Sequence, residues 1–401
     1  MFNHHSTLGL PPRTLTILGS RPGQWKPLHL EAVRDRLVDE RKREQPEDRS
    51  IELGDCRFQF DNAGGAYVRF RGRSRFGTPR PMSSNAMFQL FRVLSRPKHM
   101  GLLEQLVEEG TDQDLRMAEG IIRRLVERGH SKHRVRFRTA LRHLDPADLG
   151  HRLQRLPSPR RSKAPQAHAL RTVRIVTAVV SEKYRNYDDA RFVSDLLETV
   201  SKPEEARVIS VHRSSEGFSM RLSMAKGRPA EREPYPMLEL RNSEVGYGST
   251  VVAAGLFTLI CTNGMHSWKS TGIHRWPHRV EADEVGKELA EVLERIGVAT
   301  KSNLDDYAFA RKIRIGDSSA EALQWAEPRL RSHNLSKAFI RRVGGALDDE
   351  TTSRHKDGGF ALSSLVDAIT LSAQGAGYTR RFDLERLAGR LIEEERLDKA
   401  A

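Results

Sequence analysis

The stretch that decides the fold runs from Leu238 to His266 and reads LELRNSEVGYGSTVVAAGLFTLICTNGMH. A polar segment broken by glycines leads there into a long apolar run, which ends abruptly at Cys261-Thr262-Asn263-Gly264. Asn and Gly tolerate positive φ, so we expect a sharp turn where the apolar run stops. The stretch therefore predicts a buried strand that ends in small polar side chains, a place where functional sites are often built.

The bulk composition indicates a folded protein of the cytoplasm. The chain has 401 residues, 38% of them hydrophobic, which is enough for a sizeable core. No apolar run reaches the ~18 residues that cross a bilayer, and the N-terminus lacks the pattern of a signal peptide. Cys56 and Cys261 are the only cysteines. Two distant cysteines suit a reducing compartment, so we expect a cytoplasmic location and no membrane partner.

The positive charge is concentrated in one part of the chain. The net charge is +14, and residues 116–163 carry 14 Lys/Arg against 4 acidic residues, which is +10 of that total. Arginine forks match phosphate groups, and the release of counterions drives the binding of basic surfaces to polyanions. Nucleic acid is therefore the leading partner. The alternative is a solvated basic surface without a polyanion ligand.

Composition and the positions of proline, glycine and serine divide the chain into five segments. We expect a loose N-terminal arm over residues 1–50, in which residues 28–43 can form a charged helix, and a basic hairpin and helical region over 51–156. A Pro- and Ser-rich basic linker follows over 157–169, because such a composition packs no core. An α+β core over 170–300 and a helical C-terminal region over 301–401 complete the chain.

The region after the arm has the pattern of a basic ribbon followed by helices. Residues 56–60 and 66–70 alternate apolar and polar side chains around Asn62-Ala63-Gly64-Gly65, which predicts a hairpin. The second strand continues with basic residues on one face of an extended chain, namely Arg69, Arg71, Arg73 and Arg75. Helices are expected over 83–94, 97–107 and 111–128. A second basic strand follows, in which Arg134, Arg136 and Arg138 alternate with Val135 and Phe137.

The middle and the end of the chain predict an α+β fold with an antiparallel sheet packed on helices. Strands are expected over 172–180, 206–212, 218–224, 237–241 and 249–261, with a helix over 189–200. Helical periodicity then predicts helices over 281–296, 303–313, 319–331, 336–343, 362–371 and 383–395.

Two ordered motifs in the core carry a resemblance to a known family. The first is Val180-Ser181-Glu182-Lys183-Tyr184-Arg185-Asn186-Tyr187-Asp188-Asp189 before a helix. The second comprises Asn242, Glu244 and Gly246, and then Cys261, Asn263 and Gly264 at the end of the apolar run. In this order, over roughly residues 170–300, they resemble a family of phage- and plasmid-encoded proteins described as a domain of unknown function. The resemblance implies an origin in mobile elements and no defined reaction.

A weaker likeness, in the order of elements and in charge, is to the single-strand annealing proteins RecT and Erf. It is an analogy of fold alone, so it carries no residue of those proteins over to this chain.

The candidate DNA-binding residues lie at the first motif and on the basic strands. Tyr184 and Tyr187 could stack on unpaired bases while Arg185 holds a phosphate. The alternative is that both tyrosines close the core at the start of a helix. Arg221 and Arg241 could extend the same surface.

The sequence offers residues for two kinds of metal chemistry and lacks the motifs of nucleotide binding. Cys261, His266, His274 and His278 could form a zinc site, although tighter pairs of ligands are usual. Asp188, Asp189, Glu239 and Glu244 could be nuclease carboxylates that hold Mg²⁺, although acids beside basic residues are more often ion-pair partners. Neither a Walker A loop nor a dinucleotide-binding glycine motif occurs. We therefore assign no catalytic residue, no metal and no cofactor.

The sequence as a whole predicts a DNA-binding protein of phage or plasmid origin that prefers single strands and acts in annealing or recombination. A metal-dependent nuclease and a non-catalytic host-interaction or regulatory module remain the alternatives. Annealing proteins commonly form rings or filaments, so assembly into a homo-oligomer is open.

Overall fold

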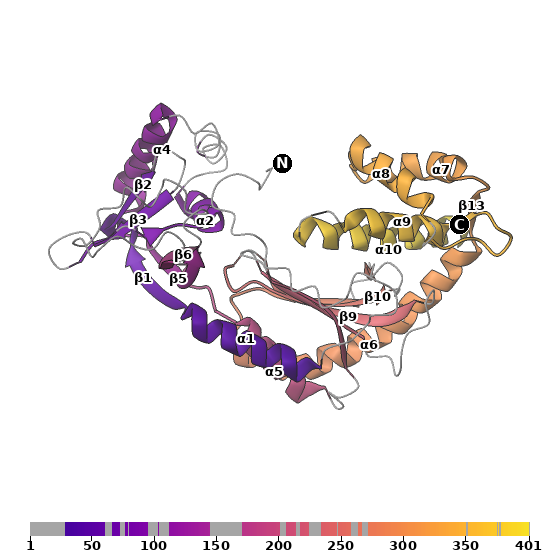
Figure 1. The fold of residues 1–401 in the computed structure, drawn as a ribbon, viewed down its shortest axis with the longest axis horizontal. Coiled ribbons are helices and arrows are strands. Elements are labelled where there is room, and N and C mark those ends of the chain that lie inside the picture. Colours follow the sequence, from indigo (N-terminus) through magenta and orange to yellow (C-terminus); the bar gives the residue numbers. More distant parts are fainter. Residues whose placement is uncertain are drawn as a thin grey trace.

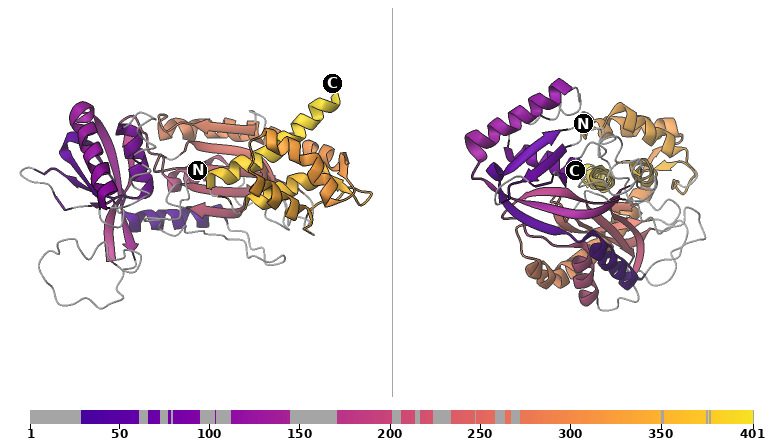
Figure 2. Two further views of the ribbon diagram at one scale, coloured as in Figure 1. Left: turned by 90° about the horizontal axis from the view of Figure 1, so that it is seen from above. Right: turned by 60° about the vertical axis from the view of Figure 1, so that its left-hand side comes forward.

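The computed structural model describes the elements of an N-terminal unit, a central sheet and a set of C-terminal helices (Figure 1). The described residues are 29–60, 66–72, 77–78, 80–94, 103, 112–144, 171–200, 206–213, 217–223, 234–246, 248–257, 264–266, 272–349, 352–374, 376 and 378–400. The N-terminal unit and the C-terminal helices lie at opposite ends of the central sheet (Figure 2).

Two small antiparallel sheets form the N-terminal unit. One has the strand order β1 (Glu47–Glu52), β5 (Arg134–Leu144), β6 (Arg171–Ser181), and the other β2 (Cys56–Phe60), β3 (Ala66–Phe70), β4 (Arg80–Pro81). A short 3₁₀ turn, Leu53–Asp55, separates β1 from β2. The helices are α2 (Ser84–Leu94) and α4 (Asp112–Leu125), which runs into a π-helical turn at Val126–His130.

The pairing of β2 with β3 confirms the predicted hairpin. Phe60 lies opposite Ala66 and Cys56 opposite Phe70, so the two strands keep one register along their length. Apolar side chains of both sheets pack with α2 and α4 in a single core, which includes Val68, Phe137 and Ile122. Burial alternates along β2, as the sequence predicts, whereas β3 is buried at Tyr67 as well as at Ala66, Val68 and Phe70.

The domain boundary that we placed at residues 157–169 is wrong. Those residues lie outside the described part, but the strands on either side of them are partners in one sheet. β5 and β6 pair antiparallel from Val135 opposite Ser181 to Leu144 opposite Arg171. A sheet buries its apolar face as a unit, so β6 belongs to the N-terminal unit and the 170–300 core begins after it.

The central sheet is antiparallel, with β12 paired to β10 beside the order β11-β10-β9-β8-β7. Its strands are β7 (Arg207–Arg213), β8 (Phe218–Ser223), β9 (Tyr235–Asn242), β10 (Thr250–Phe257), β11 (Gly264–His266) and β12 (Ile273–Trp276). The stretch from Leu238 to His266 therefore supplies most of β9 and all of β10 and β11, which are adjacent in the sheet. Residues 258–263, with the predicted Thr-Asn turn, lie outside the described part.

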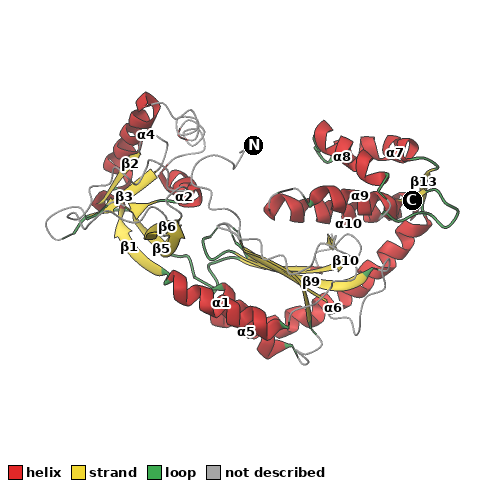
Figure 3. Ribbon diagram, viewed as in Figure 1, coloured by secondary structure: helices red, strands yellow, loops and turns green. Residues whose placement is uncertain are grey.

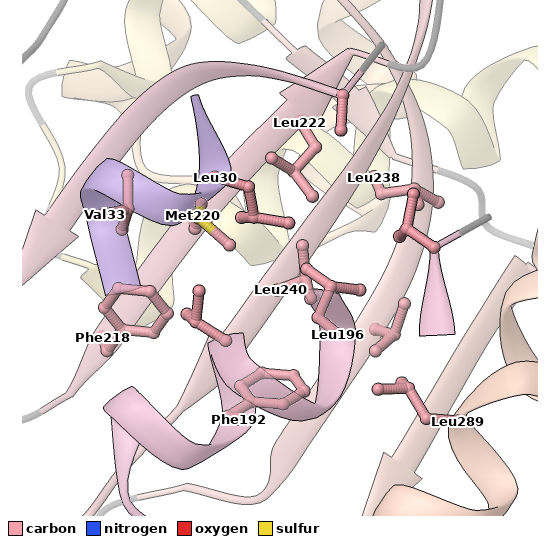
Figure 4. Packing of buried hydrophobic residues seen from close by; sticks show 14 of the residues in the cluster. Leu30, Val33, Phe192, Leu196, Phe218, Met220, Leu222, Leu238, Leu240 and Leu289 are labelled. Carbon is pink, nitrogen blue, oxygen red and sulfur yellow. The ribbon is translucent and has the colours of Figure 1, made fainter. Parts of the chain in front are cut away.

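Three helices cover one face of this sheet: α1 (Leu30–Glu44), α5 (Asp189–Thr199) and α6 (Ala282–Lys312). Their apolar side chains meet those of β8 and β9 in one core, where Phe192, Leu196 and Leu289 pack against Met220 and Leu240 (Figure 4). Each of these side chains is fully buried or nearly so. The alternate residues of β8 and β9 that point away from this core include Arg221, Glu239 and Arg241, so the second face is charged.

The helix expected over 28–43 is α1, but the prediction that residues 1–50 form a loose arm is wrong for this part. Residues 1–28 lie outside the described part, but α1 contributes Leu30, Val33 and Leu37 to the central core. These residues recur at the spacing of one helical face, and their burial ties α1 to α5.

The C-terminal region is helical, as predicted, with one correction. α6 is a continuous helix of 31 residues where we expected separate helices over 281–296 and 303–313. The residues between them contain Gly297 but no proline, and Ala299 and Thr300 are buried, so packing carries the helix through. The helices that follow are α7 (Ser319–Ser332), α8 (Lys337–Leu347), α9 (Leu362–Ala373) and α10 (Tyr378–Ala400).

These helices form a second core, in which Leu330, Val343 and Ile369 are buried and to which β10 contributes Leu256 and α6 contributes Tyr307. Two short strands, β13 (Arg314–Gly316) and β14 (Phe360–Ala361), pair beside it. Helices gather at the C-terminal end and antiparallel strands in the middle, which confirms the predicted α+β class (Figure 3). Among the described helices, none is long and apolar enough to cross a membrane.

Candidate nucleic-acid interface

The two tyrosines of the first motif are buried, and the prediction that they stack on bases is wrong. Tyr184 is 7% exposed and Tyr187 is 3% exposed. The hydroxyl of Tyr184 donates to the carbonyl oxygen of Ser243 at 2.8 Å, and that of Tyr187 donates to Oδ2 of Asp195 at 2.6 Å. Burial, the largest cause, raises the pKa of both phenols. The alternative, that the tyrosines close the core, describes their positions.

Arg138 is held in the interior by the second motif. Its side chain is buried, and it donates to the carbonyl oxygen of Glu244 at 3.0 Å and to Oε2 of the same residue at 3.1 Å. It also contacts the side-chain oxygen of Asn186. A guanidinium whose donors are used in this way has no fork left for a phosphate. Arg138 is therefore a structural residue that joins β5 to the turn after β9.

A cluster of charged residues around Arg213, which the sequence did not predict, lies beside Arg138 and Glu244. Arg213, at the end of β7, reaches Oδ2 of Asp189 at 3.1 Å, Oε2 of Glu40 at 3.0 Å and Oε1 of Glu44 at 3.3 Å. Burial alone would lower the pKa of Arg213, but these carboxylates and Glu244 outweigh burial and raise it. Through these ion pairs, the cluster around Arg213 connects α1 and α5 to the central sheet.

The four carboxylates considered for a nuclease site have structural partners instead. Asp188 caps α5 by accepting from the backbone N–H of Arg191 at 2.9 Å. Asp189 pairs with Arg213, and burial, followed by the charge of Glu244, raises the pKa of Asp189. Glu244 pairs with Arg138, and Glu239 with Arg221. Carboxylates held by arginines in this way are poor ligands for Mg²⁺, because the cation would have to displace each partner.

The second motif shapes the turn after β9. Asn242 is 1% exposed, and its Nδ2 donates to the carbonyl oxygen of Tyr187 at 2.6 Å and to Oδ1 of Asp189 at 2.9 Å. Gly246 has φ +71°, and a Cβ there would lie 2.9 Å from Cγ1 of Val180. Gly264 opens β11 opposite Phe257, while Cys261 and Asn263 lie outside the described residues.

Arg221 and Arg241 join the charged face of the central sheet to α10. Arg221 is buried and reaches Oε2 of Glu239 at 2.7 Å and Oε2 of Glu385 at 2.5 Å. Arg241 is 7% exposed, and its guanidinium lies 4.5 Å from the ring centroid of Phe382. Neither side chain lies on a surface that DNA could reach, so both predicted DNA contacts are corrected to structural roles.

The remaining predicted arginines lie at or near the surface. Arg134 pairs with Glu182 at 3.2 Å, and Arg136 donates to the carbonyl oxygen of Tyr184 at 3.1 Å. Arg185 forms an ion pair with Glu281. On the hairpin, Arg69 donates to the side-chain oxygen of Gln59 at 3.1 Å, and Arg71 lies 3.7 Å from Asp55. Arg73 and Arg75 lie outside the described residues.

Two histidines of the zinc hypothesis, His274 and His278, have other partners in the described structure. Nδ1 of His274 lies 2.7 Å from a guanidinium nitrogen of Arg295, and the ring of His278 packs against Tyr184 with centroids 4.8 Å apart. Cys261 lies outside the described part of the chain, and His266 lies in β11. Within the described part, no group of three or more His, Cys, Asp or Glu side chains could hold a metal ion.

One face of α4 carries exposed arginines. In the sequence they contribute to the charge of residues 116–163, but we did not predict them as site residues. Leu115, Ala118, Ile122 and Val126 of α4 and its π turn are buried. The opposite side is exposed and carries four arginines, which we call the α4 arginine face: Arg116, Arg123, Arg124 and Arg128. None of the four has an ion pair with another described residue. The helical spacing of these residues was the signal that could have found the face.

Comparisons of the chain with protein-family models, with curated proteins and with solved structures found no match. The resemblance to phage and plasmid proteins and the likeness to annealing proteins therefore remain predictions from the sequence.

Proposed function

We propose that this protein binds DNA, with the α4 arginine face as the main surface that contacts backbone phosphates. The observation that carries the proposal is the contrast between two sets of arginines. Those of the central sheet, such as Arg138 and Arg221, are buried against carboxylates, whereas the four of α4 are exposed without an ionic partner among the described residues. Exposed guanidinium groups on one helix face can each neutralise a phosphate and release its counterion.

The surroundings of the face favour a polyanion as its ligand. The exposed side of α4 also carries Met117, which is 46% exposed, and Gly120, where a Cβ would meet no atom within 4 Å. The backbone at Gly120 is thus open to close approach by a large ligand. Glu127 is the acidic residue on this side of the helix, beside the four arginines, so the local charge is positive.

Phosphate contacts, and not the stacking of bases on aromatic rings, supply the binding energy in this proposal. The preference for single strands rested on Tyr184 and Tyr187, whose rings are buried. Phosphates are common to single and double strands, so we expect both to bind, with the salt dependence typical of phosphate contacts. A role in annealing or recombination inside the cytoplasm is the use of this binding that we propose.

Fluorescence anisotropy with labelled single- and double-stranded oligonucleotides tests this proposal at salt concentrations from about 50 to 200 mM. The variant Arg116→Gln/Arg123→Gln/Arg124→Gln should weaken binding and reduce the slope of log K against log salt for duplex DNA by about 2 to 3. The matched control is Lys337→Gln/Arg341→Gln/Arg342→Gln, which removes the same charge from exposed positions of α8.

The control separates a specific surface from the effect of net charge. If the α8 variant loses affinity as much as the α4 variant does, attraction to the whole protein explains binding and the α4 face is not the interface. Absence of binding to every oligonucleotide by the unchanged protein would contradict the proposed function itself.

A further inference from the structure

A second group of arginines lies between the two sheets of the N-terminal unit, on one aromatic ring. Phe70, the last residue of β3, packs edge-on against Phe137 of β5 with ring centroids 4.9 Å apart. The guanidinium carbon of Arg49, on β1, lies 5.4 Å from the centroid of Phe70, and that of Arg80, on β4, lies 5.6 Å from it. The ring of Phe70 is thus in cation–π contact with one arginine from each sheet.

The pairing of backbone segments places a third arginine, Arg174 of β6, beside Arg80. Met82 and Val176 form a parallel bridge, so Arg80 and Arg174, each two residues earlier, lie side by side on neighbouring segments. Arg174 is fixed in position, because it donates to the carbonyl oxygen of Gln45 at 2.9 Å and lies 3.1 Å from Oε1 of Glu47. Its place beside Arg80 therefore does not depend on a flexible side chain.

The charges of this group are not balanced within the described structure. Glu47 is paired with Arg174, while Arg49 and Arg80 have no ion pair with any described residue. Burial, and after it the charge of Arg174, lowers the pKa of Arg80; Glu47 offsets part of this and Arg49 adds to it, so the pKa stays below its ordinary value. Like charges held this close repel one another, and an anion placed between them would remove that cost.

We propose that Arg49 and Arg80 form a binding site for a phosphate group beside the ring of Phe70. Arg174, whose donors are used by Gln45 and Glu47, adds positive charge next to this site. Two guanidinium groups offer several N–H donors, and a phosphate has enough oxygens to accept several charge-assisted bonds from them. The phosphate comes either from a DNA backbone, in which case the site rests on the proposed function, or from free phosphate or a nucleotide.

The site is distinct from the α4 arginine face, so the two can be tested separately. Inorganic phosphate is titrated into the full-length protein by calorimetry, at an ionic strength held constant with chloride. We expect Arg49→Gln/Arg80→Gln to weaken phosphate binding at least about tenfold, the loss of roughly one charge-assisted contact. The α4 variant should bind phosphate as the unchanged protein does.

The matched control for stacked arginines is Arg341→Gln/Arg342→Gln on α8, where the Arg342 guanidinium lies 5.3 Å from the ring centroid of Phe339. It removes the same charge, including one stacked guanidinium, and should leave phosphate binding unchanged. Circular dichroism of each variant checks the fold, and Arg80→Lys, which keeps the charge but loses the fork, should bind phosphate with intermediate strength.

The outcomes distinguish this site from the proposed function. Equal phosphate binding by the unchanged protein and by Arg49→Gln/Arg80→Gln, or none by either, overturns the site. Competition of phosphate with an oligonucleotide that has no terminal phosphate identifies the DNA backbone as the source. Phosphate binding without such competition identifies a free phosphate or nucleotide. DNA binding that fails while phosphate binding persists overturns the DNA proposal alone.

Discussion

Asp189 and Arg213 are bound side chain to side chain, with 3.1 Å between Oδ2 and Nε, where the first residue of α5 meets the last residue of β7. Both are largely buried, and Asn242 donates to the other oxygen of Asp189 at 2.9 Å. The pair therefore connects the helical layer to the central sheet. Its loss should lower the free energy of unfolding of the protein.

Removing the cation of this pair should destabilise the protein strongly. Arg213→Leu leaves the carboxylate of Asp189 buried without its partner, and such a change costs about 3–5 kcal/mol of unfolding free energy. Urea denaturation followed by circular dichroism measures the loss. The control is Arg191→Gln on the exposed side of α5, whose ion pairs with Asp195 and Asp283 lie at the surface, so its effect should be far smaller. Equal losses in the two variants would show that burial does not set the cost.

Stability should depend on pH through His278. Burial lowers the pKa of this imidazole, so the folded protein binds a proton less readily than the unfolded chain does. The contribution of neutral His278 is therefore fully present above the unfolded pKa of about 6.5 and is lost as pH falls below it. We expect the free energy of unfolding to fall more steeply between pH 7.5 and 5.5 in the unchanged protein than in His278→Gln, as measured by urea denaturation at each pH. Parallel curves would contradict the prediction.

Two glycine substitutions should change stability in opposite directions. Gly246 has φ +71°, and a new Cβ would meet Val180 at 2.9 Å and Tyr184 at 3.2 Å, so Gly246→Ala should cost about 1–3 kcal/mol. Gly120 lies within α4 with open space around it, and Gly120→Ala should stabilise the helix by about 0.5–1 kcal/mol. Thermal unfolding of both variants measures the contrast, and a shift of the same sign in both would refute it.

The attachment of α10 to the central sheet should depend on Glu385. This carboxylate is fully buried and accepts from Arg221 at 2.5 Å and from Arg381 at 2.9 Å. Glu385→Gln weakens both contacts, since it removes the negative charge and leaves the cation of Arg221 with Glu239 alone. Hydrogen exchange in α10 should accelerate at least about tenfold, the change expected for a loss of roughly 1.4 kcal/mol. Exchange in α8 serves as the internal control, and an unchanged rate in α10 would show that the helix is held by apolar contacts.

The sequence predicted local elements well, because their signals are local. The hairpin of β2 and β3, the strands β7 to β10 and the helices α7 to α9 follow from alternation and helical spacing. α6 was divided in two because Gly297, Ser302 and Asn303 weaken helical propensity, and tertiary packing overrode that preference.

The roles of the charged residues could not be predicted, because they are decided by partners far away in the chain. Arg138 meets Glu244 and Arg221 meets Glu385, over separations of 106 and 164 residues. A basic strand that faces solvent and one that faces buried carboxylates have the same alternating pattern. The face of α4, by contrast, is set by helical spacing alone and was within reach of the sequence.

The pairing of β5 with β6 has a consequence for how this protein can vary. Leu144 and Arg171 lie opposite each other, so the chain leaves the sheet and returns to it at adjacent positions. When both ends are anchored in this way, each doubling of the length between them costs only about 0.6 kcal/mol. The number of residues between these two positions, which include the basic residues from Arg152 to Lys163, can therefore change at a small cost in chain entropy. The net charge of the chain can thus change between these two strands while their register is kept.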